Sequence, residues 1–143
     1  MKLACAFDHA GVPLRETVVT ALQSAGHETV DLVGIRFWTR RQIDIASLTR
    51  DAAPMTFLLA HDPRRLTEAA ALGVPLVLSG HTHGGQVVLP LVGAPAAAKF
   101  PVVAGIGRRD KTIMFVSRGV GTIYVPVRIN CPPEVALLTL QPA

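Results

Sequence analysis

The sequence predicts an α/β protein with a mainly parallel sheet, flanking helices and antiparallel strands toward the C-terminus, arranged like a three-layer sandwich. In the first half of the chain, short apolar runs alternate with stretches of helical periodicity, which is typical of strands joined by helical crossovers. Beyond Gly93 the periodicity changes to alternation, which favours antiparallel strands. Half of the 143 residues are hydrophobic and 17% are charged, so the chain can bury a core and does not have a disordered composition.

The N-terminal part predicts a strand, a helix and a second strand. Residues 2–7 form a short apolar run that ends in turn residues. Residues 12–25 carry apolar side chains at helical spacing, and Gly26 stands where a left-handed cap ends a helix. Residues 28–33 are again apolar, so we expect a strand that lies parallel to the first.

The same alternation continues along the chain. We expect a short helix at residues 43–52 and strands at 56–60 and 75–79. Between these two strands, Asp62-Pro63 combines an N-cap carboxylate with proline at the first helical position, which predicts a helix start. The remaining expected strands are residues 112–117, 122–128 and 135–140.

Composition argues against several classes of protein. The longest apolar stretches fall short of the roughly 20 residues of a membrane-spanning helix, and no signal-peptide pattern is present, so we expect a cytoplasmic protein without a membrane partner. Cys5 and Cys131 show neither disulfide nor metal-ligand spacing and are expected in the core. The net charge of +4 is dispersed and the aromatic residues are not interleaved with the basic pairs, which argues against nucleic acid.

Two partners stay open after these exclusions. The dispersed basic residues can attract a small phosphorylated molecule. A chain this apolar and this short is expected to leave a hydrophobic patch on its surface. A second copy of the chain can cover such a patch, so we expect a homo-oligomer.

Three of the five histidines lie where α/β proteins form ligand sites. His61 follows one predicted strand and His81 follows the next, and neighbouring parallel strands end at the same edge of a sheet. In an extended segment His81 and His83 project to the same side, and Gly84 and Gly85 leave room beside them for a substrate. Because neutral imidazole binds zinc, iron or manganese, we expect a metal or anion site; the alternative is that each histidine only caps a strand end.

Four motifs that follow the predicted strands carry a family resemblance. They are His61-Asp62-Pro63, Gly80-His81-Thr82-His83-Gly84-Gly85-Gln86, Ser117-Arg118-Gly119-Val120-Gly121 and Asn130-Cys131-Pro132-Pro133-Glu134. With them, residues 32–140 resemble the C-terminal half of a calcineurin-like metallophosphoesterase. The resemblance implies that His61 and His81 bind one metal of a dinuclear centre and that His83 binds the other.

The resemblance is incomplete in its acidic ligands. The family's N-terminal half supplies a Gly-Asp motif, whose aspartate bridges both metals, and a Gly-Asn-His-Asp motif, and this sequence contains neither. Two neighbouring cations need negative charge to offset their repulsion. We therefore expect a single divalent ion, zinc, manganese or iron, rather than a pair.

The first 32 residues resemble another family. Phe7-Asp8-His9-Ala10-Gly11 and Ser24-Ala25-Gly26-His27-Glu28 are similar to the start of type B ribose-5-phosphate isomerase. In that family the Asp-His-Ala-Gly turn lies in the sugar-phosphate site, which implies that Asp8 and His9 contact substrate. We therefore expect one chimeric α/β domain, residues 1–143, with an isomerase-like segment 1–32 and a metallophosphoesterase-like segment 33–143.

A hypothesis about Asp8 joins the two segments. If the first strand belongs to the same sheet, Asp8 approaches the edge that carries His61, His81 and His83 and completes one metal site with a position open for water. The alternative is that Asp8 only caps the following helix. We expect a truncated chimera with little or no hydrolytic activity; a metal-dependent phosphoesterase that hydrolyses a phosphate ester and a sugar-phosphate isomerase-like binder are the alternatives.

Overall fold

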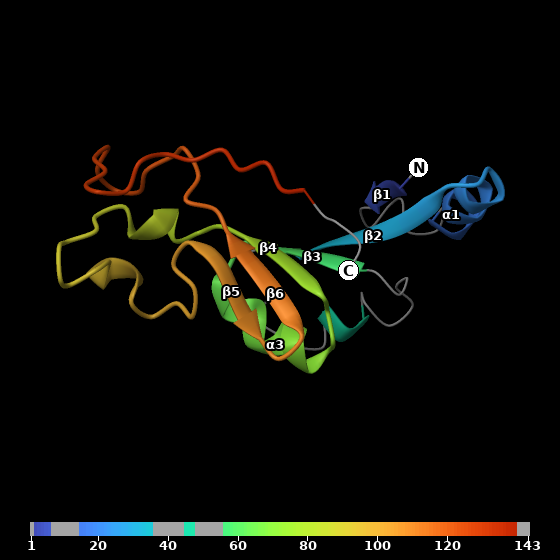
Figure 1. Ribbon diagram of the computed structural model, residues 1–143, viewed down its shortest axis with the longest axis horizontal. Helices are drawn as coiled ribbons and strands as arrows, with labels where there is room; N and C mark the ends of the chain where they lie inside the picture. The colour runs from blue at the N-terminus through green and yellow to red at the C-terminus, as the bar shows by residue number, and fades with distance from the viewer. Residues whose placement is uncertain (1, 7–14, 36–44, 48–55, 140–143) are drawn as a thin grey trace.

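The computed structural model describes residues 2–6, 15–35, 45–47 and 56–139, and its centre is a six-stranded sheet of order β1-β2-β3-β4-β6-β5 (Figure 1). The strands are β1 (Lys2–Ala6), β2 (Glu28–Ile35), β3 (Thr56–Ala60), β4 (Leu76–Ser79), β5 (Gly105–Arg109) and β6 (Thr112–Val116). All neighbouring pairs are parallel except β5 with β6. The predicted α/β class with a mainly parallel sheet is confirmed.

Helices α1 and α3 lie in two of the crossovers between parallel strands. Helix α1 (Arg15–Ser24) joins β1 to β2 and is followed by Gly26, whose φ of 80° forms the predicted left-handed cap. Helix α3 (Leu66–Ala71) joins β3 to β4 after a 3₁₀ turn, Pro63–Arg65. In Figure 1, α1 lies beside β2 at one end of the sheet and α3 lies beside β5 and β6 at the other. None of the helices in the described ranges is long and apolar enough to cross a membrane.

The start of the second crossover follows the predicted capping chemistry. A side-chain oxygen of Asp62 accepts a hydrogen bond from the backbone N–H of Arg64 at 2.9 Å, and Pro63 occupies the first position of the turn. The helix predicted at 43–52 lies mostly outside the described residues. Within it, residues 45–47 are helical and Ile45 is fully buried.

The hydrophobic core forms on one face of the sheet. Burial alternates along β3 and β6, as expected when one face of a strand is covered and the other is partly open. On β3, Leu58 is fully buried, whereas Leu59 points to the other face and is 37% exposed. The buried cluster comprises Ile45, Leu58, Ala60, Leu66, Ala69, Val74, Val77, Met114 and Val116.

The prediction of strands at 122–128 and 135–140 is wrong for the residues that the structure describes. From residue 122 to 139 the chain contains a single isolated bridge, between Ile129 and Val87. Pro126 has no N–H to give to a ladder, and the φ of 62° at Tyr124 turns the backbone away from an extended path. The side chain of Gln86 also binds both carbonyl groups, of Ile123 and Val125, that a neighbouring strand would use.

The antiparallel pair forms instead between β5 and β6, joined through Asp110 and Lys111. Asp110 has a φ of 53°, the left-handed conformation that closes two-residue hairpins. Strand β5 was not predicted because its sequence, Gly-Ile-Gly-Arg-Arg, has no apolar alternation. As an edge strand it buries little, and Ile106 is exposed.

Two predictions about the whole chain, the origin of its segments and its self-association, stay predictions. The junction proposed between the isomerase-like and metallophosphoesterase-like segments, at residues 30–34, lies within β2, which pairs with β1 on one side and β3 on the other. The division into segments of different origin stays a prediction. Large apolar side chains are exposed at Leu91, Tyr124, Val135 and Leu137, as a surface patch requires, but self-association also stays a prediction.

Candidate metal centre

Two of the predicted metal ligands meet at the carboxyl ends of adjacent strands. His61 follows β3 and His81 follows β4, and the two strands pair in parallel. The ladder continues past the strand ends, because the N–H of Gly80 donates to the carbonyl of His61 at 3.2 Å. Nδ1 of His81 lies 3.0 Å from Nε2 of His61, and the ring centroids are 4.8 Å apart. The structure thus brings these two histidines together at the edge where the sequence placed them.

The segment that carries His81 and His83 turns sharply. His81 has a φ of 70° and His83 a φ of 51°, and residues 83–85 form a 3₁₀ turn, so the prediction of an extended segment is wrong. Non-glycine residues in this region of φ cost free energy and gather at functional sites. Thr82 is buried, and its hydroxyl donates to the carbonyl of Val103 at 2.6 Å.

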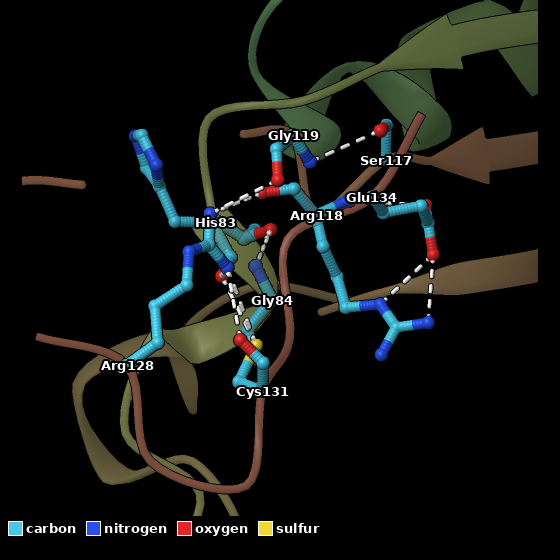
Figure 2. A network of polar contacts seen from close by, with 9 residues as sticks. His83, Gly84, Ser117, Arg118, Gly119, Arg128, Cys131 and Glu134 are labelled. Atoms are coloured by element: carbon cyan, nitrogen blue, oxygen red, sulfur yellow. Dashed lines mark hydrogen bonds and ion pairs between the residues drawn. The ribbon is translucent and has the colours of Figure 1, made fainter. Parts of the chain in front are cut away.

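His83 lies in a separate polar network. Its Nδ1 is 3.1 Å from the carbonyl oxygen of Gly121, and Figure 2 shows it beside Arg128 and Cys131. Within the described ranges, no three His, Cys, Asp or Glu side chains come close enough to hold one metal ion. His83 therefore does not complete a three-ligand cluster with His61 and His81 in this arrangement.

His81 is held by an aromatic ring and by nearby charges. The buried ring of Phe100 packs edge-on against it, with centroids 5.3 Å apart. Arg64 and Lys99 lie over the same phenyl ring, at 5.5 and 5.4 Å from its centroid. Burial lowers the pKa of His81, and His61, Arg64 and Lys99 act in the same direction. His81 is therefore neutral near neutral pH, which is the form that binds a metal.

The nearest carboxylate along the chain, Asp62, is already engaged. Its oxygens accept hydrogen bonds from Nε of Arg64 at 3.0 Å and from Nη2 at 2.5 Å. Burial acts to raise the pKa of Asp62, but the hydrogen bonds from Arg64 outweigh it and hold the pKa below its usual value. Asp62 is thus ionised and serves the helix start and the ion pair.

The histidine pair fits a divalent ion as a partial set of ligands. Nδ1 of His81 and Nε2 of His61 approach to 3.0 Å beside an open depression, and imidazole suits zinc, manganese or iron. The described residues add no carboxylate to the pair. The depression is lined by Gly34, Ile35, Leu59, Ala60, His61, Leu78, Ser79 and Gly80.

Asp8 and His9 lie outside the described residues, so their predicted roles in metal and substrate binding stay predictions. The described part of the sheet shows how far such a ligand has to reach. Strand β2 separates β1 from β3, which places the two strands about 10 Å apart.

Gly84 and Gly85 are buried and serve close packing. A Cβ atom on Gly84 would lie 2.7 Å from Sγ of Cys131 and would also meet the Arg118 stem. A Cβ atom on Gly85 would meet the methyl group of Ala94. The space that the sequence suggested for a substrate is filled by the protein at these points, and substrate contact by the two glycines stays a prediction.

Sequence reasoning gave no role to the residues around His83. Arg128 donates to several backbone carbonyl groups, and Arg118 forms an ion pair with Glu134 at 2.7 Å. The buried thiol of Cys131 donates to the carbonyl groups of His83 and Gly84, each at 3.3 Å. The Ser-Arg-Gly and Cys-Pro-Pro-Glu motifs contained three of these residues, but no local pattern linked them to a histidine more than 30 positions earlier.

The chain is similar to metallophosphoesterases. It is 42% identical to the phosphodiesterase YaeI of Escherichia coli, over 58% of this chain and 31% of that protein. It is 35% identical to the uncharacterized metallophosphoesterase YkuE of Bacillus subtilis, over 60% of this chain and 31% of that protein. It is also 35% identical to an uncharacterized metallophosphoesterase of Helicobacter pylori, over 82% of this chain and 35% of that protein.

The matches cover a part of each relative. The chain spans about a third of the length of the curated relatives it matches. No family model and no solved structure matches the chain. The relatives support the metallophosphoesterase resemblance and a divalent metal cofactor, and they give no support to an isomerase origin of residues 1–32.

Proposed function

We propose that this chain contributes a pair of histidine ligands to the metal centre of a metal-dependent phosphoesterase whose substrate class is a phosphate ester. The observation that carries the proposal is the 3.0 Å approach of His61 Nε2 and His81 Nδ1 at the carboxyl edge of the sheet. The similarity to curated metallophosphoesterases supports it. A divalent ion bound there supplies Lewis acidity toward a phosphoryl oxygen.

The residues around the pair prepare it for that task. The lowered pKa of His81, caused first by burial, keeps a lone pair available near neutral pH. Phe100 fixes the plane of the His81 ring. Lys99 lies over the Phe100 ring and adds positive charge near His81, which favours the approach of an anionic substrate.

We infer that the chain by itself turns over slowly and binds one ion rather than two. Two cations at one site need bridging negative charge. In the described part of the chain, Asp62 is held by Arg64 and no other carboxylate joins the histidine pair. Asp8 is the residue that we expect to supply the missing charge.

Metal titration of the purified chain tests the proposal. Zinc and manganese are added to the wild-type protein and to His81→Ala, and binding is followed by calorimetry. Loss of a ligand is expected to weaken binding by about 100-fold or more, since even partners of ligands change affinity by about 10- to 100-fold. His27→Gln, which precedes β2 at the opposite edge of the sheet, is the matched control and keeps wild-type affinity.

Activity is measured on the same proteins with a chromogenic phosphodiester and added manganese. Slow turnover that disappears in His81→Ala but persists in His27→Gln supports a phosphoesterase. Equal metal affinity in the wild type and His81→Ala contradicts the proposed centre, whatever the turnover.

A further inference from the structure

Arg128 ties three separate stretches of chain to one guanidinium group (Figure 2). Its Nη1 donates to the carbonyl of His83 at 3.0 Å and to that of Cys131 at 3.3 Å. Its Nη2 donates to the carbonyl groups of Arg118 at 2.9 Å, Gly119 at 3.1 Å and Gly121 at 2.5 Å. A planar group with several fixed donors is suited to holding carbonyl groups at set positions.

One of these carbonyl groups also holds the His83 imidazole. The Gly121 oxygen lies 3.1 Å from Nδ1 of His83. A carbonyl oxygen only accepts hydrogen bonds, so Nδ1 carries a proton in this contact, and in the neutral imidazole Nε2 then has the lone pair. A bond of this kind to a backbone carbonyl is how proteins fix which nitrogen of a histidine binds a metal.

Arg128 thus restrains both the backbone and the imidazole ring of His83. It binds the backbone carbonyl of His83 directly and the Gly121 carbonyl that receives the ring N–H. Residues 118–121 form no helix or strand, so no backbone ladder fixes the Gly121 carbonyl. The guanidinium supplies that restraint in its place.

Carbonyl dipoles rather than a carboxylate surround the charge of Arg128. Within the described ranges Arg128 has no ion pair, since Glu134 pairs with Arg118, and its buried Nε has no hydrogen-bond partner. The side chain is half-buried, and the five carbonyl groups that it binds offset the loss of hydration of its charge. All five belong to the stretches around His83.

We propose that Arg128 is the positioning residue of His83: it holds the Gly121 carbonyl that keeps the neutral imidazole in its Nδ1-protonated form and leaves Nε2 as the nitrogen that can accept a hydrogen bond. This choice of protonated nitrogen does not depend on the function proposed above, and it is measured without metal.

The tautomer of His83 is read by ¹⁵N NMR of histidine-labelled full-length protein at pH 8 without metal, with the signal assigned by its loss in His83→Gln. The wild type is expected to show the proton on Nδ1. Arg128→Lys is expected to shift His83 toward the Nε2-protonated form that free imidazole side chains favour. Arg118→Lys, which alters the neighbouring ion pair without touching His83, is expected to leave the tautomer unchanged.

A metal titration of the same variants separates the two proposals. Because the proposed centre is formed by His61 and His81, Arg128→Lys and Arg118→Lys are both expected to keep wild-type metal affinity. A changed tautomer in a protein that binds no metal supports the positioning role and contradicts the proposed centre. An unchanged tautomer in Arg128→Lys overturns the positioning role. If that variant does not fold, a wild-type His83 protonated on Nε2 overturns it equally.

Discussion

The two histidine regions of this protein are built in different ways. His61 and His81 follow paired parallel strands, and the backbone ladder continues to them through the bond from Gly80 to His61. His83 lies among residues of the C-terminal segment, which between residues 117 and 139 forms no helix or strand in the described chain. Its position depends on side chains that bind carbonyl groups, above all Arg128.

This difference predicts how each region responds to substitution. A ladder between strands repeats the same bond many times, so the strand ends keep their position as long as the core beneath them is packed. Around His83, by contrast, each hydrogen bond comes from a single side chain and is not repeated along a ladder. Loss of core volume should therefore affect the region of His61 and His81 by lowering the free energy of unfolding of the whole protein. In the region of His83, loss of a single side-chain contact should change the local geometry.

Leu58→Ala is expected to give the largest effect. Leu58 is fully buried in β3, next to Val77 of β4, under the strand ends that carry the histidine pair. Truncation of a buried leucine leaves a cavity and costs about 2–5 kcal/mol of the free energy of unfolding. Urea denaturation followed by circular dichroism measures this loss.

Leu59→Ala is the matched control for the strand region, because Leu59 neighbours Leu58 but is 37% exposed on the other face. It should cost clearly less than Leu58→Ala. If the two variants lost the same free energy of unfolding, both faces of β3 would be equally covered, which contradicts a core on one face of the sheet.

Gly84→Ala tests the packing of the His83 region. Gly84 has a φ of 65°, and a new methyl group would lie 2.7 Å from Sγ of Cys131. Strain and overpacking are together expected to cost about 1–3 kcal/mol of the free energy of unfolding. Gly80→Ala is the control, since a Cβ at that position has no atom within 4 Å among the described residues apart from its chain neighbours, and it should be close to neutral in urea denaturation.

The region of β3 and β4 that carries His61 and His81 could be predicted from the sequence, because the patterns that determine its strands and turns are local. Apolar runs, the Asp62-Pro63 start and the cap at Gly26 each act within a few residues, and the structure confirms the elements that they predict. The meeting of His61 and His81 adds one further rule, that adjacent parallel strands end at the same edge. Their 3.0 Å approach follows from these rules.

The His83 region could not be predicted in the same way. The alternation of Ile123, Val125 and Val127 shows which side chains are apolar, but it does not show whether a neighbouring strand exists to pair with them, and these side chains are exposed. The bond from Arg128 to His83 joins residues 45 positions apart, so no local pattern announces it. His83 also has a φ of 51°, which a run of residues with helix or strand periodicity does not predict.

Glu134→Gln should give the smallest change in the free energy of unfolding. Glu134 lies at the edge of the polar network around His83, where it forms an ion pair with Arg118. The hydrogen bond from Arg118 holds the pKa of Glu134 below its usual value of 4.5, despite some opposing burial. A carboxylate with a lowered pKa stabilises the fold above its unfolded pKa and loses that contribution as the pH falls through its folded pKa. The ion pair is partly exposed, so the wild type should exceed the variant by about 1 kcal/mol or less at pH 7.

The pH dependence of that difference identifies its origin. The stability gap between wild type and Glu134→Gln should be constant from pH 8 to about pH 6 and should close below about pH 4.5, because Glu134 then becomes protonated and resembles glutamine. Urea denaturation at a series of pH values measures the gap. If the stability gap instead stays constant down to pH 3, Glu134 contributes through packing and hydrogen-bond geometry rather than through its charge. The polar network around His83 is then not stabilised by the charge of the Arg118–Glu134 ion pair.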